Sequence, residues 1–470
     1  MAKATAERLA VRLSGIVGAD QVLVGDEISE DYRHDEALGA TPTRPGYLVR
    51  PSTADQVAEI VRLAASDGVP LTARGSATGM SGACQPSEGG IVVSFERMNS
   101  VLEIDTENHV AVVQPGVTLA ELDVRTAEVG LTYPVAPGEL SASLGGNVAT
   151  NAGGMRAVRY GVTRNQVLGL QAVLGTGELI RTGGRISKIS SGYDLTQLII
   201  GSEGTLAVVT EAILKLHPRL AHQRTVLAPF NDLDGVVRAV PKIIASGLAP
   251  NILEYIDAFT MAAITYTTKL SLGVPDEVRD ATQAYLVVAL ENTAADRVDG
   301  DVQQLGELLG DLGATDVYVL EGTAAHKLIE AREKAFWTAK AAGAHDIVDV
   351  VVPRSAMPEF LTKVRQLATD SGSGVAGCGH AGDGNVHLAV FQADPDIRHR
   401  LLHDMFATGI ALGGAISGEH GIGREKKPYF LRLTDPAQLA LMRRIKQSFD
   451  PAGILNPEVL LSENRSEELA

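Results

Sequence analysis

Two short segments in the second half of the chain carry the side chains best suited to chemistry. Residues 379–387 read Gly-His-Ala-Gly-Asp-Gly-Asn-Val-His, and residues 417–423 read Ser-Gly-Glu-His-Gly-Ile-Gly. Gly382 to Asn385 has turn chemistry, which predicts a hairpin with His380 and His387 as cross-strand neighbours on one face, their Cβ atoms roughly 5 Å apart. Two imidazoles in that arrangement can share one metal ion.

The second segment completes this set. Glu419 adds a carboxylate, which gives an N,N,O ligand set with open positions for a substrate, and the adjacent His420 points elsewhere and is free to move protons. The alternative is that His, Asp and Asn side chains in a glycine-rich turn bond only to the loop backbone. These segments alone leave both interpretations open.

Composition limits the classes of function. The chain has 470 residues and 45% apolar content, which predicts more than one domain. Its formal charge of −16 argues against a nucleic-acid partner or an anionic membrane surface, so a bound anion must be held by local groups. The two cysteines, Cys84 and Cys378, are too far apart in sequence for a disulfide scaffold. We expect buried free thiols, a reducing compartment and a cytoplasmic location.

The N-terminus predicts an amphipathic helix rather than a signal peptide, because charged residues interrupt the apolar positions between Met1 and Ile16. No stretch approaches the roughly 20 apolar residues that span a bilayer. We therefore expect a protein that is not integral to a membrane.

The first half alternates strands and helices around three glycine-rich segments. A strand at 46–50, a helix capped by Thr53 and Gln56, and a strand at 69–73 lead directly into residues 74–82. No helix opens there, so backbone amides would have to hold a phosphate without a helix dipole. Strands at 91–95 and 110–114 follow, and then a helix that Thr118 and Glu121 cap and Gly130 ends.

The other two glycine-rich segments span residues 137–154 and 201–206. The longer one has almost no bulky side chains, admits a flat ligand and supplies Ser, Thr and Asn donors. Glycine clusters are more often mere turns, but three of them spaced by strands favour a ligand site.

The pattern changes near His222, which predicts a separate α+β domain and a helical C-terminal region. The expected helices are 233–246, 296–312, 399–412 and 436–449, and the expected strands are 284–290 and 315–320. Residues after Ser462 are polar and should be frayed.

Together these segments resemble the flavin-dependent oxidoreductases of the vanillyl-alcohol oxidase and p-cresol methylhydroxylase (PCMH) superfamily, and most closely its FAD-linked D-2-hydroxyacid dehydrogenases. The likeness runs from about Tyr32 to Leu461. Its most specific motifs are residues 74–82, 145–154, 201–204, 380–387, 418–423 and 450–457.

The resemblance implies an α+β fold: a two-subdomain PCMH-type FAD-binding domain, then an antiparallel-sheet cap and substrate domain with C-terminal helices. The division we expect is an N-terminal helical segment at 1–41, the FAD-binding domain at 42–220, the substrate and metal domain at 221–461 and a polar tail at 462–470.

The resemblance places the FAD pyrophosphate on the first glycine-rich segment and the flavin near residues 143–154. FAD should be non-covalent, because residues 74–79 contain no histidine to tether it. The implied cofactor-binding residues are Arg74, Gly75, Ser76, Ala77, Thr78, Gly79, Ser81, Pro137, Gly138, Ser143, Leu144, Gly145, Gly146, Asn147, Thr150, Asn151, Gly153, Gly201, Glu203, Gly204 and Asn456.

By the same likeness His380, His387 and Glu419 are the ligands of a divalent metal, usually assigned to zinc. His420 would take the hydroxyl proton of a 2-hydroxyacid while the C2 hydride passes to flavin N5. Arg332 would pair with the substrate carboxylate, with a solvated helix face as the alternative.

At several positions the sequence departs from the motifs of the dicarboxylate enzymes, and these departures favour as substrate a D-2-hydroxy monocarboxylate with a small or apolar side chain. Ile347 stands where 2-hydroxyglutarate enzymes carry a lysine, and Phe336 and Trp337 follow Arg332. Residues 388–389 are Leu-Ala where dicarboxylate enzymes tend to offer an asparagine, and Glu458-Val459 replaces the usual Gly-Lys of the closing motif, so any contact of that lysine is lost.

Three other functions stay open at this point: a D-2-hydroxyglutarate dehydrogenase, a flavin-free metallohydrolase using the same His and Glu set, and a flavin-binding subunit without catalysis. The resemblance also implies an electron acceptor, which can be an electron-transfer protein, a quinone-linked subunit or a cytochrome. A homodimer is one oligomeric state open to the chain.

Overall fold

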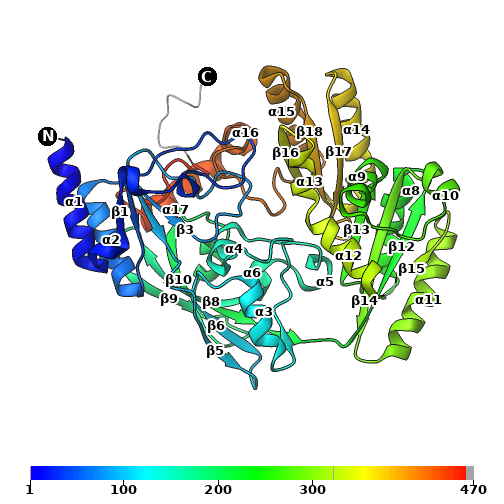
Figure 1. The fold of residues 1–470 in the computed structure, drawn as a ribbon, viewed down its shortest axis with the longest axis horizontal. Coiled ribbons are helices and arrows are strands. Elements are labelled where there is room, and N and C mark those ends of the chain that lie inside the picture. Colours follow the sequence, from blue (N-terminus) through cyan, green and yellow to red (C-terminus); the bar gives the residue numbers. More distant parts are fainter. Residues whose placement is uncertain (1, 321, 462–470) are drawn as a thin grey trace.

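The computed structural model describes residues 2–320 and 322–461, which form two lobes (Figure 1). The N-terminal part of the chain builds one lobe around two sheets. The middle of the chain builds the other lobe around one larger sheet, and the C-terminal helices return toward the first (Figure 1).

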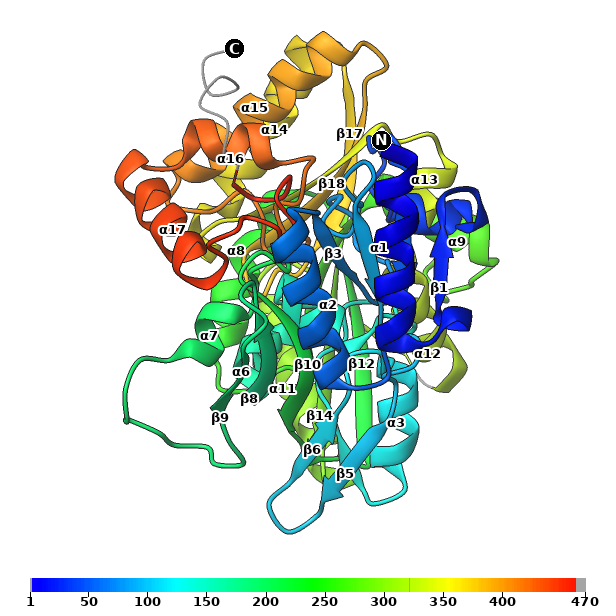
Figure 2. The same cartoon turned by 90° about the vertical axis from the view of Figure 1, so that its left-hand side faces the viewer.

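A four-stranded sheet and helices α1 (Ala2–Val17) and α2 (Ala54–Asp67) make up the outer part of the first lobe (Figure 2). Thr53 begins α2 by accepting the Gln56 amide, while the Gln56 side chain accepts the Ser52 amide instead of that of Thr53. Gly68 ends the helix with a φ of 63°. The strand order is β1 (Val22–Val24), β2 (Tyr47–Val49), β4 (Ile91–Ser94) and β3 (Leu71–Arg74), parallel except for β1.

A five-stranded antiparallel sheet lies next to it, and α3 (Leu119–Ala127), with its Thr118 and Glu121 capping box, packs on that part of the lobe. The strand order is β5 (Val101–Asp105), β6 (Val110–Val113), β10 (Ala207–Lys215), β8 (Val167–Leu174) and β9 (Leu179–Gly183). The short elements nearby are β7 (Leu131–Thr132), β11 (His217–Pro218), α4 (Leu144–Thr150), α5 (Ala157–Tyr160), α6 (Thr163–Gln166) and α7 (Leu195–Ile199).

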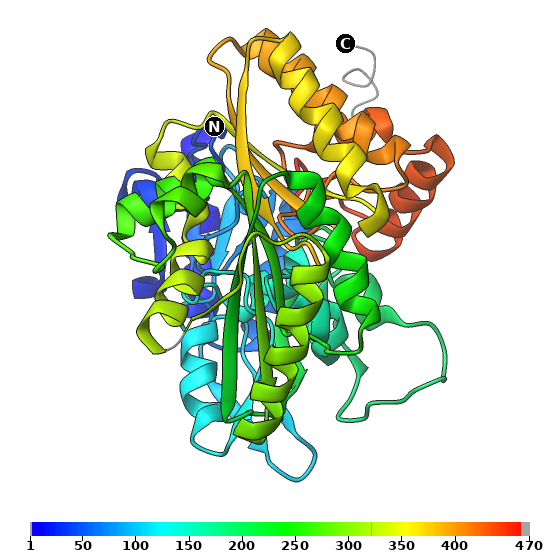
Figure 3. The ribbon, with the colours of Figure 1, turned by 90° about the vertical axis from the view of Figure 1, so that its right-hand side faces the viewer.

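The second lobe is a seven-stranded antiparallel sheet with helices on both faces (Figure 3). Its strand order is β15 (Tyr318–Leu320), β12 (His222–Phe230), β14 (Ala284–Asn292), β13 (Ile252–Asp257), β17 (Gly374–Gly379), β18 (Asn385–Phe391) and β16 (Asp346–Val351). Its helices are α8 (Leu233–Ala245), α9 (Ala258–Thr268), α10 (Asp276–Ala281), α11 (Ala295–Asp311), α12 (Gly322–Glu333), α13 (Ala335–Ala341), α14 (Met357–Asp370) and α15 (Pro395–Ala411).

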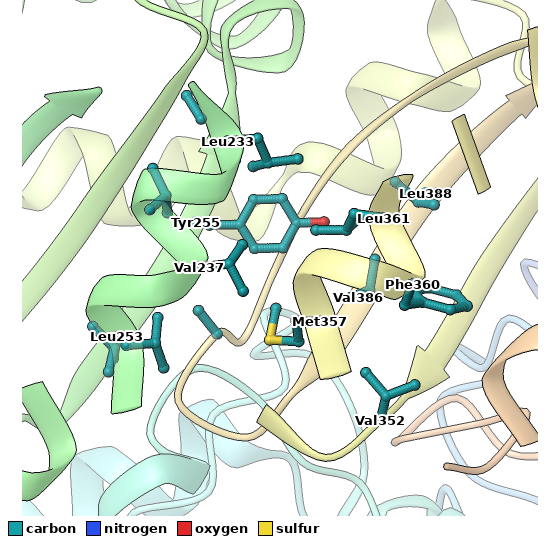
Figure 4. Close-up of a cluster of buried hydrophobic side chains, with 14 of the residues drawn as sticks. Leu233, Val237, Leu253, Tyr255, Val352, Met357, Phe360, Leu361, Val386 and Leu388 are labelled. Carbon is teal, nitrogen blue, oxygen red and sulfur yellow. The ribbon is translucent and has the colours of Figure 1, made fainter. Parts of the chain in front are cut away.

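One face of this sheet holds the core of the lobe. Tyr255 is enclosed by α8 and α14, with Leu233, Val237 and Leu361 close to its ring (Figure 4). Because side chains alternate along a strand, Val348, Val350, Val386 and Leu388 enter this core, and their sequence neighbours point to the opposite face. That opposite face carries Glu254, Asp349 and His387.

After α15, helix α16 (Lys427–Leu433) packs on the core of the second lobe, and α17 (Pro436–Phe449) and the segment beyond it pack into the first lobe. The amide of Leu71 donates to the Ile454 carbonyl at 2.8 Å, and the amide of Asn456 donates to the Leu71 carbonyl at 2.9 Å. Ile454 and Leu455 join the core under the four-stranded sheet.

The predicted α+β fold is confirmed. The expected helices and strands are present with shifted ends, and β15 is shorter than the expected strand at 315–320, since residues 315–317 lie outside the sheet. The predicted polar tail lies outside the described residues. Among those that the structure does describe, no helix is both long enough and apolar enough to cross a bilayer.

Candidate active site

The side chains of His380, His387 and Glu419 converge. Glu419 Oε1 lies 3.0 Å from His380 Nε2 and 3.3 Å from His387 Nε2. The hairpin forms, but β17 ends at Gly379, and the His380 carbonyl accepts the amides of Asp383 and Asn385 in the turn. The cross-strand partner of His387 is therefore Cys378, and the expected direct pairing of His380 with His387 is wrong. Their rings still meet on one face, 4.9 Å apart.

This spacing fits a bound metal ion. An ion with bonds of about 2.1 Å in tetrahedral geometry keeps its ligand atoms about 3.4 Å apart. The two N–O distances of 3.0 and 3.3 Å are close to that value. The buried His387 Nε2 has no hydrogen-bond partner in the part of the chain that the structure describes, so it is available as a ligand. Zinc suits such an N,N,O set.

Glu254 orients both His380 and Arg332 from β13. The carboxylate is fully buried, lies 2.7 Å from His380 Nδ1 and pairs at 2.6 Å with the Arg332 guanidinium. This contact puts the proton of His380 on Nδ1 and leaves Nε2 to bind a metal. In the metal-free protein burial lowers the pKa of His380, but Glu254 and Glu419 outweigh burial and raise that pKa to about 10.

Arg332 lies near the end of α12 and is only 7% exposed, so it does not belong to a solvated helix face. Its Nε, buried among the described residues, has no hydrogen-bond partner there, whereas its Nη2 faces Glu254 Oε2 at 2.6 Å. Buried donors of this kind cost free energy unless a ligand satisfies them. Arg332 lines the same cavity as the three metal-ligand candidates, where a carboxylate would supply the missing acceptor.

His420 faces the same space. Its Nδ1 is buried 3.9 Å from Asp349 Oδ2, and its ring lies 5.0 Å from that of His387. Burial is the main cause that lowers the pKa of His420, to about 4. The imidazole is therefore neutral near pH 7 and can accept a proton.

The cavity around these groups becomes apolar away from them. Its far walls include Phe259, Phe336, Ile347, Ala389 and Phe391, and we call it the apolar cavity. Apart from Arg332 and the three histidines, no cationic side chain of the described chain lines it. Leu388 points into the core and Trp337 lines neighbouring cavities, so neither of them shapes this one, contrary to expectation.

A second cavity, here called the glycine-lined cavity, adjoins the first and shares Glu419 and His420 with it. The amides of Ala77, Thr78 and Gly79 make no hydrogen bond within the described residues, and Ala77 has a φ of 57°. Free amides in a strained loop can bind phosphate oxygens. The expected cofactor residues that line this cavity are Arg74, Gly75, Ser76, Ala77, Thr78, Gly79, Pro137, Gly138, Ser143, Gly145, Gly146, Asn147, Thr150, Gly153, Glu203 and Gly204.

The other expected cofactor residues do not line it; they are Ser81, Leu144, Asn151, Gly201 and Asn456. Leu144 is buried in the core, and the Asn151 side chain accepts the Arg164 amide. Ser81 Oγ donates to the His420 carbonyl, and the Asn456 amide donates to the carbonyls of Ala83 and Glu203. These polar groups brace the loops around the cavity.

The side chains of two residues that line the cavity also hydrogen-bond to the backbone of other segments. The Arg74 guanidinium donates to the backbone carbonyls of Asp31 and His34. The Glu203 carboxylate accepts the amides of Ile422 and Gly423 at 2.8 and 2.6 Å. Their side chains therefore hold neighbouring segments in place.

Comparisons with known proteins match both halves of the chain to families of FAD-dependent proteins. Residues 45–183 match the FAD binding domain family, and residues 219–460 match the family of FAD linked oxidases, C-terminal domain. The chain belongs to the FAD-linked oxidases and oxidoreductases. The flavin-free metallohydrolase is therefore wrong.

Relatives extend along almost the whole chain. An uncharacterized FAD-linked oxidoreductase of Mycobacterium tuberculosis is 62% identical and covers 97% of this chain and 99% of its own length. A D-lactate dehydrogenase of Anaerostipes hadrus is 37% identical over 94% of each chain. The solved structure of p-cresol methylhydroxylase with substrate bound has a TM-score of 0.79 at 18% identity over 96% of each chain, which shows the shared PCMH-type fold.

Proposed function

We propose that the protein is an FAD-dependent dehydrogenase that oxidises a D-2-hydroxy monocarboxylate to the 2-oxoacid, with a divalent metal, zinc by analogy, at His380, His387 and Glu419. The observation that carries this proposal is the apolar cavity. It brings the three-ligand set, a buried arginine whose Nε has no hydrogen-bond partner among the described residues, and a neutral histidine together beside the glycine-lined cavity.

Each group has one role. When bound, non-covalent FAD accepts the C2 hydride, and the metal lowers the pKa of the substrate hydroxyl. Arg332 holds the substrate carboxylate, to which its unpartnered Nε can donate. Glu254 keeps Arg332 and His380 in place from behind.

His420 acts as the general base. Its Nδ1 lies 3.9 Å from Asp349 Oδ2 and makes no hydrogen bond within the described residues, and a nitrogen of this ring accepts the hydroxyl proton. Its low pKa keeps that nitrogen unprotonated at neutral pH.

The cavity walls favour a monocarboxylate. Burying a second carboxylate against Ile347, Ala389 and Phe391 without a cation would cost several kcal/mol. The similarity to a D-lactate dehydrogenase supports a small or apolar side chain. A relative named D-2-hydroxyglutarate dehydrogenase, from Stutzerimonas stutzeri, is 30% identical over 95% of this chain, so that substrate belongs in the test.

We further propose that residues 42–220 form the FAD-binding domain and 221–461 the substrate and metal domain, with an N-terminal segment at 1–41. Reduced flavin would pass its electrons to an electron-transfer protein, a quinone-linked subunit or a cytochrome. We also propose that the protein works in the cytoplasm and as a homodimer.

The test is kcat/KM with an artificial acceptor dye for D-lactate, D-2-hydroxybutyrate, a longer apolar homologue and D-2-hydroxyglutarate. The proposal expects the monocarboxylates to be preferred by at least about tenfold. A preference for D-2-hydroxyglutarate would contradict the assignment of the far wall, and no turnover of any 2-hydroxyacid would contradict the function.

A further inference from the structure

The segment that carries Glu419 and His420 is held in an unusual way. Every backbone amide from Gly418 to Gly423 donates to a side-chain oxygen. The amides of Gly418, Glu419 and His420 donate to Asp349 Oδ2 at 3.0, 3.0 and 2.8 Å. The Gly421 amide donates to Ser417 Oγ at 2.9 Å, and the last two amides donate to Glu203.

Asp349 accepts three of these six bonds. The residue lies on β16 with no exposed surface, and Ser417 Oγ donates to the same Oδ2 atom at 2.7 Å. Its other oxygen, Oδ1, accepts the side-chain amide of Asn385 at 2.8 Å. Both carboxylate oxygens therefore accept hydrogen bonds from the protein itself.

Glycines make this arrangement possible. A Cβ at Gly418 would lie 2.4 Å from Asn385 Nδ2, and one at Gly423 would lie 1.8 Å from the Ser81 carbonyl oxygen. Gly421 and Gly423 also have φ values of 83° and 55°. The glycines of this motif thus let the segment approach the carboxylates closely.

The segment joins both lobes, because Asp349 belongs to the seven-stranded sheet and Glu203 to the loop after α7 that lines the glycine-lined cavity. Glu419 and His420 follow directly from the amides that Asp349 holds. The residues just before them are also bridged to this strand, Ser417 to Asp349 and Ala415 to Val351.

We propose that Asp349 is the positioning residue of this site: it fixes Glu419 against the two histidines and His420 against the apolar cavity. The inference rests on the proposed function, since it assigns the carboxylate a role toward the metal ligand and the base of that site. Asp349 itself lines neither the apolar cavity nor the glycine-lined cavity.

Asp349→Asn is the informative variant, because asparagine has a single acceptor oxygen. Whichever way its amide is turned, either the three backbone amides or Asn385 must face an NH2 group in place of an acceptor. The side chain keeps its size, so no cavity is created. Asp346→Asn is the matched control on the same strand, since among the described residues its carboxylate accepts only the adjacent Ile347 amide.

The experiment measures zinc affinity by competition with a chromophoric chelator on the FAD-loaded protein, together with FAD content and Tm. Asp349→Asn should bind zinc about tenfold to a hundredfold more weakly, as residues that orient metal ligands usually do, with wild-type FAD content. Asp346→Asn should match the wild type. Unchanged zinc affinity in folded, FAD-loaded Asp349→Asn would overturn the proposal.

A second readout addresses His420. At zinc concentrations that fill the site, Asp349→Asn should still reduce its flavin at least about tenfold more slowly than the wild type, because the base is displaced as well. Full recovery of the rate with zinc would overturn the His420 part.

If Asp349→Asn does not fold, Ser417→Ala tests the positioning role of Asp349 instead. This variant removes one donor to Asp349 and the acceptor of the Gly421 amide, and it should weaken zinc binding by about fivefold, the value of one hydrogen bond. Wild-type affinity in that case would overturn the proposal. A wild-type protein that binds no divalent metal would overturn both this inference and the metal assignment, whereas equal affinities in wild type and variants would overturn only the inference.

Discussion

A lysine in place of Ile347 should move the substrate preference toward a dicarboxylate. Ile347 lies on β16, on the same face as Asp349 and opposite Ala389 of β18, and it lines the apolar cavity. The far carboxylate of D-2-hydroxyglutarate would gain a charged hydrogen bond worth about 1.5–3 kcal/mol, or about 10- to 150-fold in kcat/KM. Desolvation of the ammonium in this apolar space favours the lower part of that range.

The assay is kcat/KM for D-2-hydroxyglutarate and for D-2-hydroxybutyrate with an acceptor dye, expressed as a ratio. Ile347→Lys should raise that ratio at least about tenfold, and Ile347→Met, of similar volume but uncharged, should leave it near the wild-type value. An unchanged ratio in Ile347→Lys with full FAD and metal would refute our placement of the substrate's far end.

Four further perturbations test other parts of the site. Gly146→Leu should fold, because a Cβ at this position meets Ser143 Oγ at 3.1 Å and no closer atom. It should purify largely without FAD, because the rest of the side chain enters the glycine-lined cavity. Absorbance of the bound flavin measures the FAD content. His380→Ala and His387→Ala should each lose metal while keeping FAD, as seen by metal analysis, and wild-type turnover in both would end the metal assignment. His420→Ala should keep its metal and lose rate by about 10²-fold or more in single-turnover kinetics. Asp383→Asn should raise the free energy of unfolding of the chelated protein by up to about 2–3 kcal/mol at pH 7, measured by urea unfolding. The reason is that burial raises the pKa of Asp383 to about 6, so the folded protein binds this proton more tightly than the unfolded chain does. The added stability should shrink as pH falls toward about 4, and added stability that is independent of pH would contradict this prediction.

Local patterns predicted the elements well where one physical rule dominated. The amphipathic helix at α17 and the strand at β14 follow from periodicity, and the free amides of residues 77–79 follow from a glycine-rich segment that opens no helix. The turn composition of residues 382–385 predicted the hairpin but not its register, which depends on where the His380 carbonyl accepts its two amides.

The supporting carboxylates were missed because their partners are distant in sequence. Glu254 and Asp349 sit in otherwise apolar strands, and only the folded sheet brings them to Arg332 and to the Ser417–Gly423 segment. A signal was present, since an acidic residue within a buried strand is costly unless it is paired. The side chains of Ser81, Glu203 and Asn456, which the resemblance assigns to the cofactor, also brace loops through partners distant in sequence.

The central claim is that a neutral histidine, a metal and a buried arginine act on a D-2-hydroxyacid in front of FAD. Its most direct test is anaerobic mixing of the purified protein with D- and L-2-hydroxybutyrate, before and after removal of the metal with a chelator, while the yellow absorption of oxidised flavin is followed. We predict that the D enantiomer bleaches the flavin, that the L enantiomer does not, and that chelation abolishes bleaching until zinc is restored. Equal bleaching with and without the metal, or bleaching by the L enantiomer alone, would contradict the account.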